Sequence, residues 1–309
     1  MDQVPPVTRG RQVRSLPLPH RCNNPRNPAC AHCGTVIIPS PAAIMPLEDT
    51  PSISVGSWTI ESRKRPILDT PALSQWESEH LPGLGALPEM IFGGNYVRIR
   101  CDLDESKHWD IEFNALDALR EVPTEDSGVR VSCASDWLRS KHRRCDGAPP
   151  QIAKQYDWTY TTRYRGTVTG CPLVADTTAE LPLAMLAKPD PILFFDDMVL
   201  YEDELGDNGA SMYSCKVRVM PERLLLLARF FLRVDDVLLR VQDTRLYVEF
   251  AQNRVVREWK RYEADYNEVF KRHRGGVPPH RDLRALLRDS NWVVDHLPIV
   301  ERTCETIQL

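Results

Sequence analysis

The chain has 309 residues, of which 42% are hydrophobic and 8% aromatic, enough for one large domain or two smaller ones. Its net charge of −4 argues against a dedicated nucleic-acid-binding protein, which would usually be basic. No apolar stretch is long enough to cross a membrane, and the N-terminus lacks the apolar core of a secretory signal. The nine cysteines are scattered through core-like segments, which indicates reduced thiols in a cytoplasmic or nuclear protein.

Residues 1–54 are expected to form a disordered, basic arm. They hold ten of the 25 prolines and few aromatic residues, so they cannot bury enough surface to offset the entropy of ordering. The prolines also oppose the amphipathic helix of a mitochondrial targeting sequence. Thiols and imidazoles of this arm have the chemistry of zinc ligands, but the single Cys-x-x-Cys pair favours incidental cysteines in a tail. These residues are His20, Cys22, Cys30, His32 and Cys33.

From residue 55 onward the pattern becomes that of a folded domain, predicted over 55–309. Alternating apolar residues and turn signals predict strands and short helices in its first half. The expected strands are Val55–Arg63, Met90–Cys101, Ile111–Phe113, Val129–Cys133 and Tyr156–Thr169. The expected helices are Thr70–Glu79, Asn114–Glu121 and Ala134–His142.

The second half contains the longest apolar run of the chain. After strands at Ile192–Glu204 and Met212–Met220, Pro221 precedes a run that is apolar on nearly every side and predicts a buried core helix up to Val234. Two strands, Val237–Arg240 and Arg245–Phe250, are expected to form a hairpin around Gln242-Asp243. The three- and four-residue spacing of Val255, Trp259, Tyr262, Tyr266 and Val269 predicts an amphipathic helix over Arg254–Arg274.

The mixture of strands and helices has no βαβ rhythm. It therefore predicts an α+β fold, a single domain of mainly antiparallel β-sheets. The arginines of the predicted core helix, Arg229 and Arg233, need buried carboxylates, for which Glu112 is a candidate.

No catalytic motif is present. The chain lacks a nucleophile elbow, a phosphate-binding loop and a His-Glu-x-x-His sequence, so a protein without enzymatic activity or cofactor is expected. One alternative is a metal-dependent hydrolase that uses the acidic segment 196–207, although its carboxylates do not follow the register of a calcium-binding loop. A solvated acidic turn or a docking patch for a basic partner is the favoured interpretation of this segment.

A second alternative is a nucleic-acid adaptor that uses the N-terminal arm and the basic residues of 254–274. Acidic residues are interleaved with these cations, as on a solvated helix face, and we therefore expect no nucleic-acid binding.

Several segments in one order resemble the TOR signalling pathway regulator family (TIPRL-like proteins). They are LPEMIFGGNYVRI (87–99), IEFNALDALR (111–120), VSCASDW (131–137), YDWTYTT (156–162), FFDDMVLYEDELGDNG (194–209), KVRVMP (216–221), RFFLRVDDVLLR (229–240) and DTRLY (243–247). The resemblance extends from about residue 55 to the C-terminus. It leaves the proline-rich arm outside the family core.

The resemblance implies a non-enzymatic regulator in TOR signalling, monomeric when free, which binds the catalytic subunit of type 2A, 4 or 6 serine/threonine phosphatases and inhibits it. It further implies antiparallel β-sheets with flanking helices and a cleft that takes the C-terminal tail of the phosphatase. Arginine suits the capture of a terminal carboxylate because its planar guanidinium forms two parallel hydrogen bonds. The partner-binding residues implied are Asp117, Arg120, Arg240, Val241, Asp243 and Arg245.

Two of these residues also have purely structural interpretations. Asp117 is spaced to form an ion pair with Arg120 within a short helix. Asp243 is able to shape the predicted hairpin turn.

Overall fold

The computed structural model describes residues 50–81, 84, 87–104, 107–123, 158–274 and 282–309. Within these residues, two β-sheets with antiparallel pairing form the frame. The smaller, sheet A, has the order β1 (Ser52–Val55), β2 (Trp58–Arg63), β4 (Tyr96–Asp104), β5 (Lys107–Asn114) and β6 (Thr167–Thr169). Helix α1 (Thr70–His80) follows β2, and helix α2 (Ala115–Arg120) follows β5.

Sheet B has eight strands and contains the most sequence-distinctive segments. In spatial order its strands are β3 (Met90–Ile91), β8 (Phe194–Asp203), β9 (Gly209–Val219), β10 (Arg223–Val234), β11 (Leu238–Glu249), β12 (Arg254–Asp265), β13 (Ile299–Gln308) and β7 (Val174–Ala175). The helices that accompany it are α4 (Leu183–Leu186), α5 (Tyr266–His273), α6 (Leu283–Leu286) and α7 (Ser290–His296).

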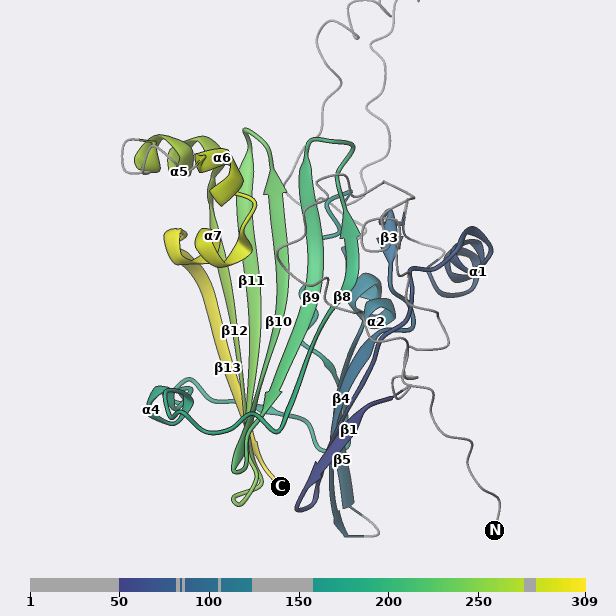
Figure 1. Ribbon diagram of the computed structural model, residues 1–309, viewed down its shortest axis with the longest axis vertical. Helices are drawn as coiled ribbons and strands as arrows, with labels where there is room; N and C mark the ends of the chain where they lie inside the picture. Colours follow the sequence, from purple (N-terminus) through teal and green to yellow (C-terminus); the bar gives the residue numbers. More distant parts are fainter. Residues whose placement is uncertain (1–49, 82–83, 85–86, 105–106, 124–157, 275–281) are drawn as a thin grey trace, which may run out of the picture. The chain divides into compact units, whose positions relative to one another are not determined.

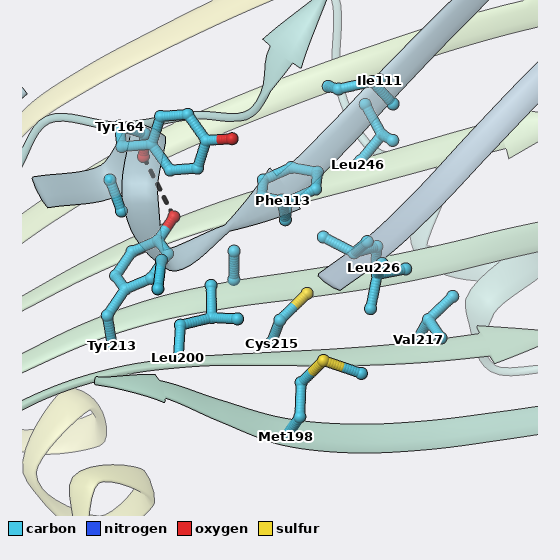
Figure 2. Close-up of a cluster of buried hydrophobic side chains, with 14 of the residues drawn as sticks. Ile111, Phe113, Tyr164, Met198, Leu200, Tyr213, Cys215, Val217, Leu226 and Leu246 are labelled. Carbon is cyan, nitrogen blue, oxygen red and sulfur yellow. Dashed lines mark hydrogen bonds between the residues drawn. The ribbon is translucent and has the colours of Figure 1, made fainter. Parts of the chain in front are cut away.

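The main core lies between the two sheets. Figure 2 shows Ile111 and Phe113 of sheet A together with Cys215, Leu226 and Leu246 of sheet B. The loop before β6 contributes to the same core, because Tyr213 donates a hydrogen bond from its hydroxyl to the backbone carbonyl of Tyr164 at 3.1 Å. Burial of these side chains provides the main driving force for packing the sheets.

The opposite side of sheet B, which we call the outer face, is covered only in part. Residues of α5, α6 and α7 pack on it in a second cluster that includes Phe231, Val241 and Tyr262. Leu186 of α4 packs beside Tyr247 and Val256 in a third. Helices α5–α7 gather at one end of the strands of sheet B and α4 lies near the other end (Figure 1). Between them, Lys216 is exposed and Leu227 and Arg245 are partly exposed, whereas Asp243 and Glu258 are buried.

The α+β fold with mainly antiparallel sheets is confirmed, but the predicted core helix is wrong. Residues Arg223–Val234 form a central strand, β10, paired with β9 and β11 along its length. A strand that is covered on both faces shows a nearly continuous apolar run, which resembles a buried helix in sequence.

Two further predictions fail for the same reason. Residues 237–250 do not form a hairpin around Gln242-Asp243, because β11 runs unbroken through both residues; the actual turn lies at Asp235-Asp236 between β10 and β11. Residues 254–274 are not one helix: β12 occupies Arg254–Asp265, and only Tyr266–His273 is helical. The proposed strand Tyr156–Thr169 is reduced to β6 in the described part.

Other predictions fall outside the described residues. These are the strand at 129–133, the helix at 134–142 and the thiol and imidazole groups of the N-terminal arm. The boundary at residue 54 remains a prediction, although β1 begins at Ser52. No helix among the described residues is long and apolar enough to cross a membrane.

Candidate functional site

The outer face of sheet B is the candidate partner surface. In an antiparallel sheet, residues in register point to the same side, so rows of side chains can be followed across the strands. One row on this face contains Asp197, Lys216, Leu227, Arg245, Glu258 and Cys304. The next contains Val199, Ser214, Arg229, Asp243, Lys260 and Arg302. Both rows lie beside the first turn of α7.

A buried ion pair lies at the centre of these rows. The guanidinium of Arg229 binds the carboxylate of Asp243 in two places, with Nε–Oδ1 and Nη2–Oδ2 distances of 2.7 and 2.8 Å. Asp243 is only 1% exposed. Burial lowers the pKa of Arg229, but the bonds from Asp243 outweigh this effect and raise it above the ordinary value. Arg229 therefore stays positively charged in the folded protein.

Arg229 also fixes the position of α7. Its Nη1 donates a hydrogen bond to Oδ1 of Asn291 at 2.9 Å and a longer one to Oγ of Ser290 at 3.4 Å. Because Asn291 and Ser290 form the first turn of α7, Asp243 orients the helix indirectly through Arg229.

A pocket of about 350 Å³ opens beside this ion pair. Its lining combines apolar side chains with a few polar groups, the usual composition of a ligand-binding pocket. The lining residues are Asp197, Met198, Val199, Met212, Ser214, Lys216, Leu227, Arg229, Ser290 and Asn291.

Two accessible cations border the pocket and the ion pair. The side chain of Lys216 is 53% exposed and lies 3.9 Å from a carboxylate oxygen of Asp197, which is a loose contact. Arg245 is one-third exposed, and its Nη2 lies 3.5 Å from Oδ2 of Asp243, whose two oxygens are already occupied by Arg229. Both cations therefore keep donors for an external anion.

Glu258 of β12 lies next to Arg245 in the first row, on the side away from the pocket. Lys260 and Arg302 each lie 2.9 Å from one of its carboxylate oxygens. Burial favours the neutral carboxyl, but the hydrogen bonds from Lys260 and Arg302 outweigh burial and hold the pKa of Glu258 below its ordinary value of 4.5.

We expect Glu258→Gln to lower the free energy of unfolding at pH 7 by roughly 1–3 kcal/mol, because two charge-assisted hydrogen bonds are weakened. A lowered carboxyl pKa stabilises the fold fully above pH 4.5, and this stabilisation is lost as pH falls through the folded-state value. The difference between wild type and variant, measured by urea unfolding, should therefore shrink below pH 4.5. A difference that grows in acid would contradict this assignment.

The structure separates the six predicted partner-binding residues into three places. Val241, Asp243 and Arg245 share the outer face, but Val241 is buried beneath the α5–α7 cluster. Arg240 points between the sheets, where its Nε donates to Glu263 at 2.6 Å and its Nη1 to Thr161 at 3.1 Å.

Asp117 and Arg120 lie apart from the other four, on α2. A carboxylate oxygen of Asp117 accepts hydrogen bonds from Asn114 at 3.0 Å and from Thr167 at 2.6 Å. Thr167 pairs with Glu112 on the side of sheet A that faces away from sheet B. Asp117 also pairs with Arg120 at 3.2 Å, as the sequence predicted. The described residues do not bring Asp117 and Asp243 into a single cleft.

The buried arginines are neutralised, but not by Glu112. Arg229 pairs with Asp243 and Arg233 with Asp235, whereas Glu112 binds Arg98. Sequence reasoning did not assign Lys216 or Arg229 to the site. One signal in the sequence could have indicated that Arg229 lies on a shared strand face. Arg223, Arg229 and Arg233 all have odd numbers, and the two-residue period of a strand places such residues on one face.

Two carboxylates of the acidic segment 196–207 have partners within the fold. Asp196 pairs with Lys64 and accepts a hydrogen bond from Ser62 at 2.6 Å, while Asp203 accepts hydrogen bonds from the backbone N–H groups of Glu89 and Leu205. In the described part of the chain, no group of three or more histidine, cysteine or acidic residues is placed to hold a metal ion. These carboxylates serve the fold.

An antiparallel sandwich with a partly covered, charged sheet face defines a binding protein. The model of the TIP41-like family matches residues 90–270, and the chain belongs to this family. It is 55% identical over 308 residues to "Type 2A phosphatase activator TIP41" of Saccharomyces cerevisiae, covering 95% of this chain and 85% of the relative. It is 38% identical over 257 residues to the human "TIP41-like protein", covering 82% and 87%.

The similarity reaches beyond the described domain. The Saccharomyces cerevisiae match covers 95% of the chain, so it includes part of residues 1–49, which the sequence analysis placed outside the family core. The "TIP41-like protein" of Dictyostelium discoideum is 38% identical over 269 residues and covers 83% of this chain and 92% of the relative.

Proposed function

We propose that this protein is a non-enzymatic regulator that binds the catalytic subunit of type 2A-like serine/threonine phosphatases. Membership of the TIP41-like family carries the proposal, since the Saccharomyces cerevisiae and Schizosaccharomyces pombe relatives are both named type 2A phosphatase activators. Those names favour activation rather than the inhibition expected from the sequence. A role in TOR signalling and a cytoplasmic or nuclear location belong to the same proposal.

The partner segment in this proposal is the C-terminal tail of the phosphatase, bound on the outer face of sheet B. Lys216 and Arg245 flank Leu227 in one row, so they are able to hold a terminal carboxylate from two sides. The apolar lining of the neighbouring pocket, which includes Val199, Met212 and Leu227, suits the side chain of the last residue.

The six sequence-predicted residues take different roles in this arrangement. Arg245 contacts the tail, while Asp243 and Val241 position Arg229 and the α7 helix beside it. Arg240 supports the interior. Asp117 and the half-exposed Arg120 form a separate, second contact with the body of the phosphatase.

We expect Lys216→Glu/Arg245→Glu to reduce binding of purified type 2A catalytic subunit at least tenfold, because reversed charges repel the tail carboxylate. Biolayer interferometry would measure the affinity, and a phosphatase assay the direction of regulation. The matched control, Lys271→Glu/Arg274→Glu, makes the same charge change at exposed positions at the end of α5, for which the described residues show no ion pair.

Two results would contradict the proposal. If folded wild type binds no catalytic subunit, the proposed function is wrong. If wild type binds and both double variants bind equally well, the surface is misplaced.

A further inference from the structure

Arg223, at the start of β10, is a buried cation with too few partners. It is 1% exposed, and its Nη1 lies 2.5 Å from Oδ2 of Asp190. Asp190 is the one carboxylate that pairs with Arg223 among the described residues. Within the same residues, Nε of Arg223 has no hydrogen-bond partner, and neither has the buried hydroxyl of Tyr247 on the same face. A buried donor without a hydrogen-bond partner lowers the stability of the fold. The free donors of Arg223 and Tyr247 could therefore bind oxygen atoms in addition to those of Asp190.

Asp190 belongs to a segment that is attached to sheet B at its two ends: Leu186 packs beside Tyr247, and the backbone N–H of Leu193 donates to the carbonyl of Val219 at 2.8 Å. The segment runs from α4 to the start of β8, and none of the α4 residues is buried. Leu183, Ile192 and Leu193 are 71%, 52% and 47% exposed, and Asp190 itself is one-third exposed. The described backbone hydrogen bonds of Ala187 and Asp190 stay within the segment. Such local bonding permits opening at a low free-energy cost.

Arg223 lies on the outer face of sheet B, on the same strand as Leu227 of the proposed tail-binding surface. Arg223, Leu225 and Leu227 alternate along β10, so all three point to the outer face. Lys216 and Arg245 are the register partners of Leu227. Leu227 lies four residues after Arg223 on β10. Four residues of an extended strand span about 13 Å. Leu225 is half-buried between the two cationic positions and provides an apolar floor.

We propose that Arg223 is a second carboxylate-binding site on the outer face of sheet B, which Asp190 occupies in the free protein as an internal competitor. The ligand is an extended peptide whose terminal carboxylate binds Lys216 and Arg245, and whose acidic side chain four residues upstream displaces Asp190 from Arg223. The proposal rests on the proposed function, because it uses the same outer face of sheet B that is proposed to bind the phosphatase tail.

Fluorescence anisotropy with full-length protein tests this site. The probes are two labelled nine-residue peptides with a free C-terminus that carry Glu or Gln four residues before the last residue. We expect Asp190→Asn to bind the Glu peptide roughly tenfold more tightly than wild type does, because the internal competitor is removed. Arg223→Met should bind the Glu and Gln peptides equally.

Asp235→Asn is the matched control. Asp235 also pairs with a buried arginine of β10, Arg233, at 2.8 Å. This pair lies at the end of sheet B where helices α5–α7 gather, away from Arg223. Asp235→Asn should behave as wild type, with melting temperatures confirming that every variant is folded. Equal affinity of Asp190→Asn for the Glu and Gln peptides would overturn the proposal.

If neither peptide binds any of the proteins, the affinities of the same proteins for the purified catalytic subunit are measured instead. Equal affinities of wild type and Asp190→Asn for it overturn the second site, whereas tighter binding by Asp190→Asn than by wild type and Asp235→Asn supports it. Absence of binding to folded wild type overturns the proposed function itself.

Discussion

Asp243→Asn is expected to lower the free energy of unfolding by about 3–5 kcal/mol. The substitution keeps the shape of the side chain but leaves the buried guanidinium of Arg229 without its counter-charge. It should also loosen the first turn of α7, because Arg229 bonds to Ser290 and Asn291. Chemical denaturation monitored by circular dichroism measures the loss.

The double variant Arg229→Met/Asp243→Leu is the control for this expectation. Replacing both charges with apolar side chains removes the pair without leaving a buried charge, so its stability should lie closer to wild type than that of Asp243→Asn. If Asp243→Asn is as stable as wild type, the pair does not hold the sheet and α7 together, and a direct role of Asp243 in partner binding regains support.

Leu226→Ala is expected to cost about 2–5 kcal/mol, because Leu226 is fully buried between the sheets and its removal leaves a cavity. Leu225→Ala is the matched control, since the neighbouring leucine points to the outer face and is only half-buried. Its cost should be clearly smaller. Equal losses at the two positions would contradict the alternation of β10.

The sequence allowed the class of fold to be predicted because strands such as β8 and β9 largely keep a simple alternation. The segments Ile192–Glu204 and Met212–Met220 were predicted as strands and are largely β8 and β9. Asp69 caps α1 through the backbone N–H of Ala72, and Pro71 occupies its first turn, as local signals indicated.

The centre of sheet B was mispredicted because both of its faces are covered. Leu224 and Leu226 face sheet A, while Phe231 faces the α5–α7 cluster, so apolar residues occur at odd and even positions alike. In β12, Trp259 and Tyr262 point to opposite faces, and their spacing imitates a helix. Periodicity alone does not distinguish these cases.

The candidate site was predictable only in part. The resemblance identified Asp243 and Arg245, which do share a face with the pocket. It also grouped Asp117 with them, although Asp117 lies with Asn114 and Thr167 of sheet A. Which residues share a surface depends on strand register and sheet packing, and these follow from contacts between distant segments.

Hydrogen–deuterium exchange of the full-length protein, with and without purified type 2A phosphatase catalytic subunit, tests the central claim most directly. With the catalytic subunit bound, we expect slower exchange in β8, β9 and β10 at Asp197, Lys216 and Leu227, and in β11 at Arg245. Protection confined to α2 and the exposed side of sheet A, around Asp117 and Arg120, would contradict the assignment of the outer face of sheet B as the phosphatase-binding surface.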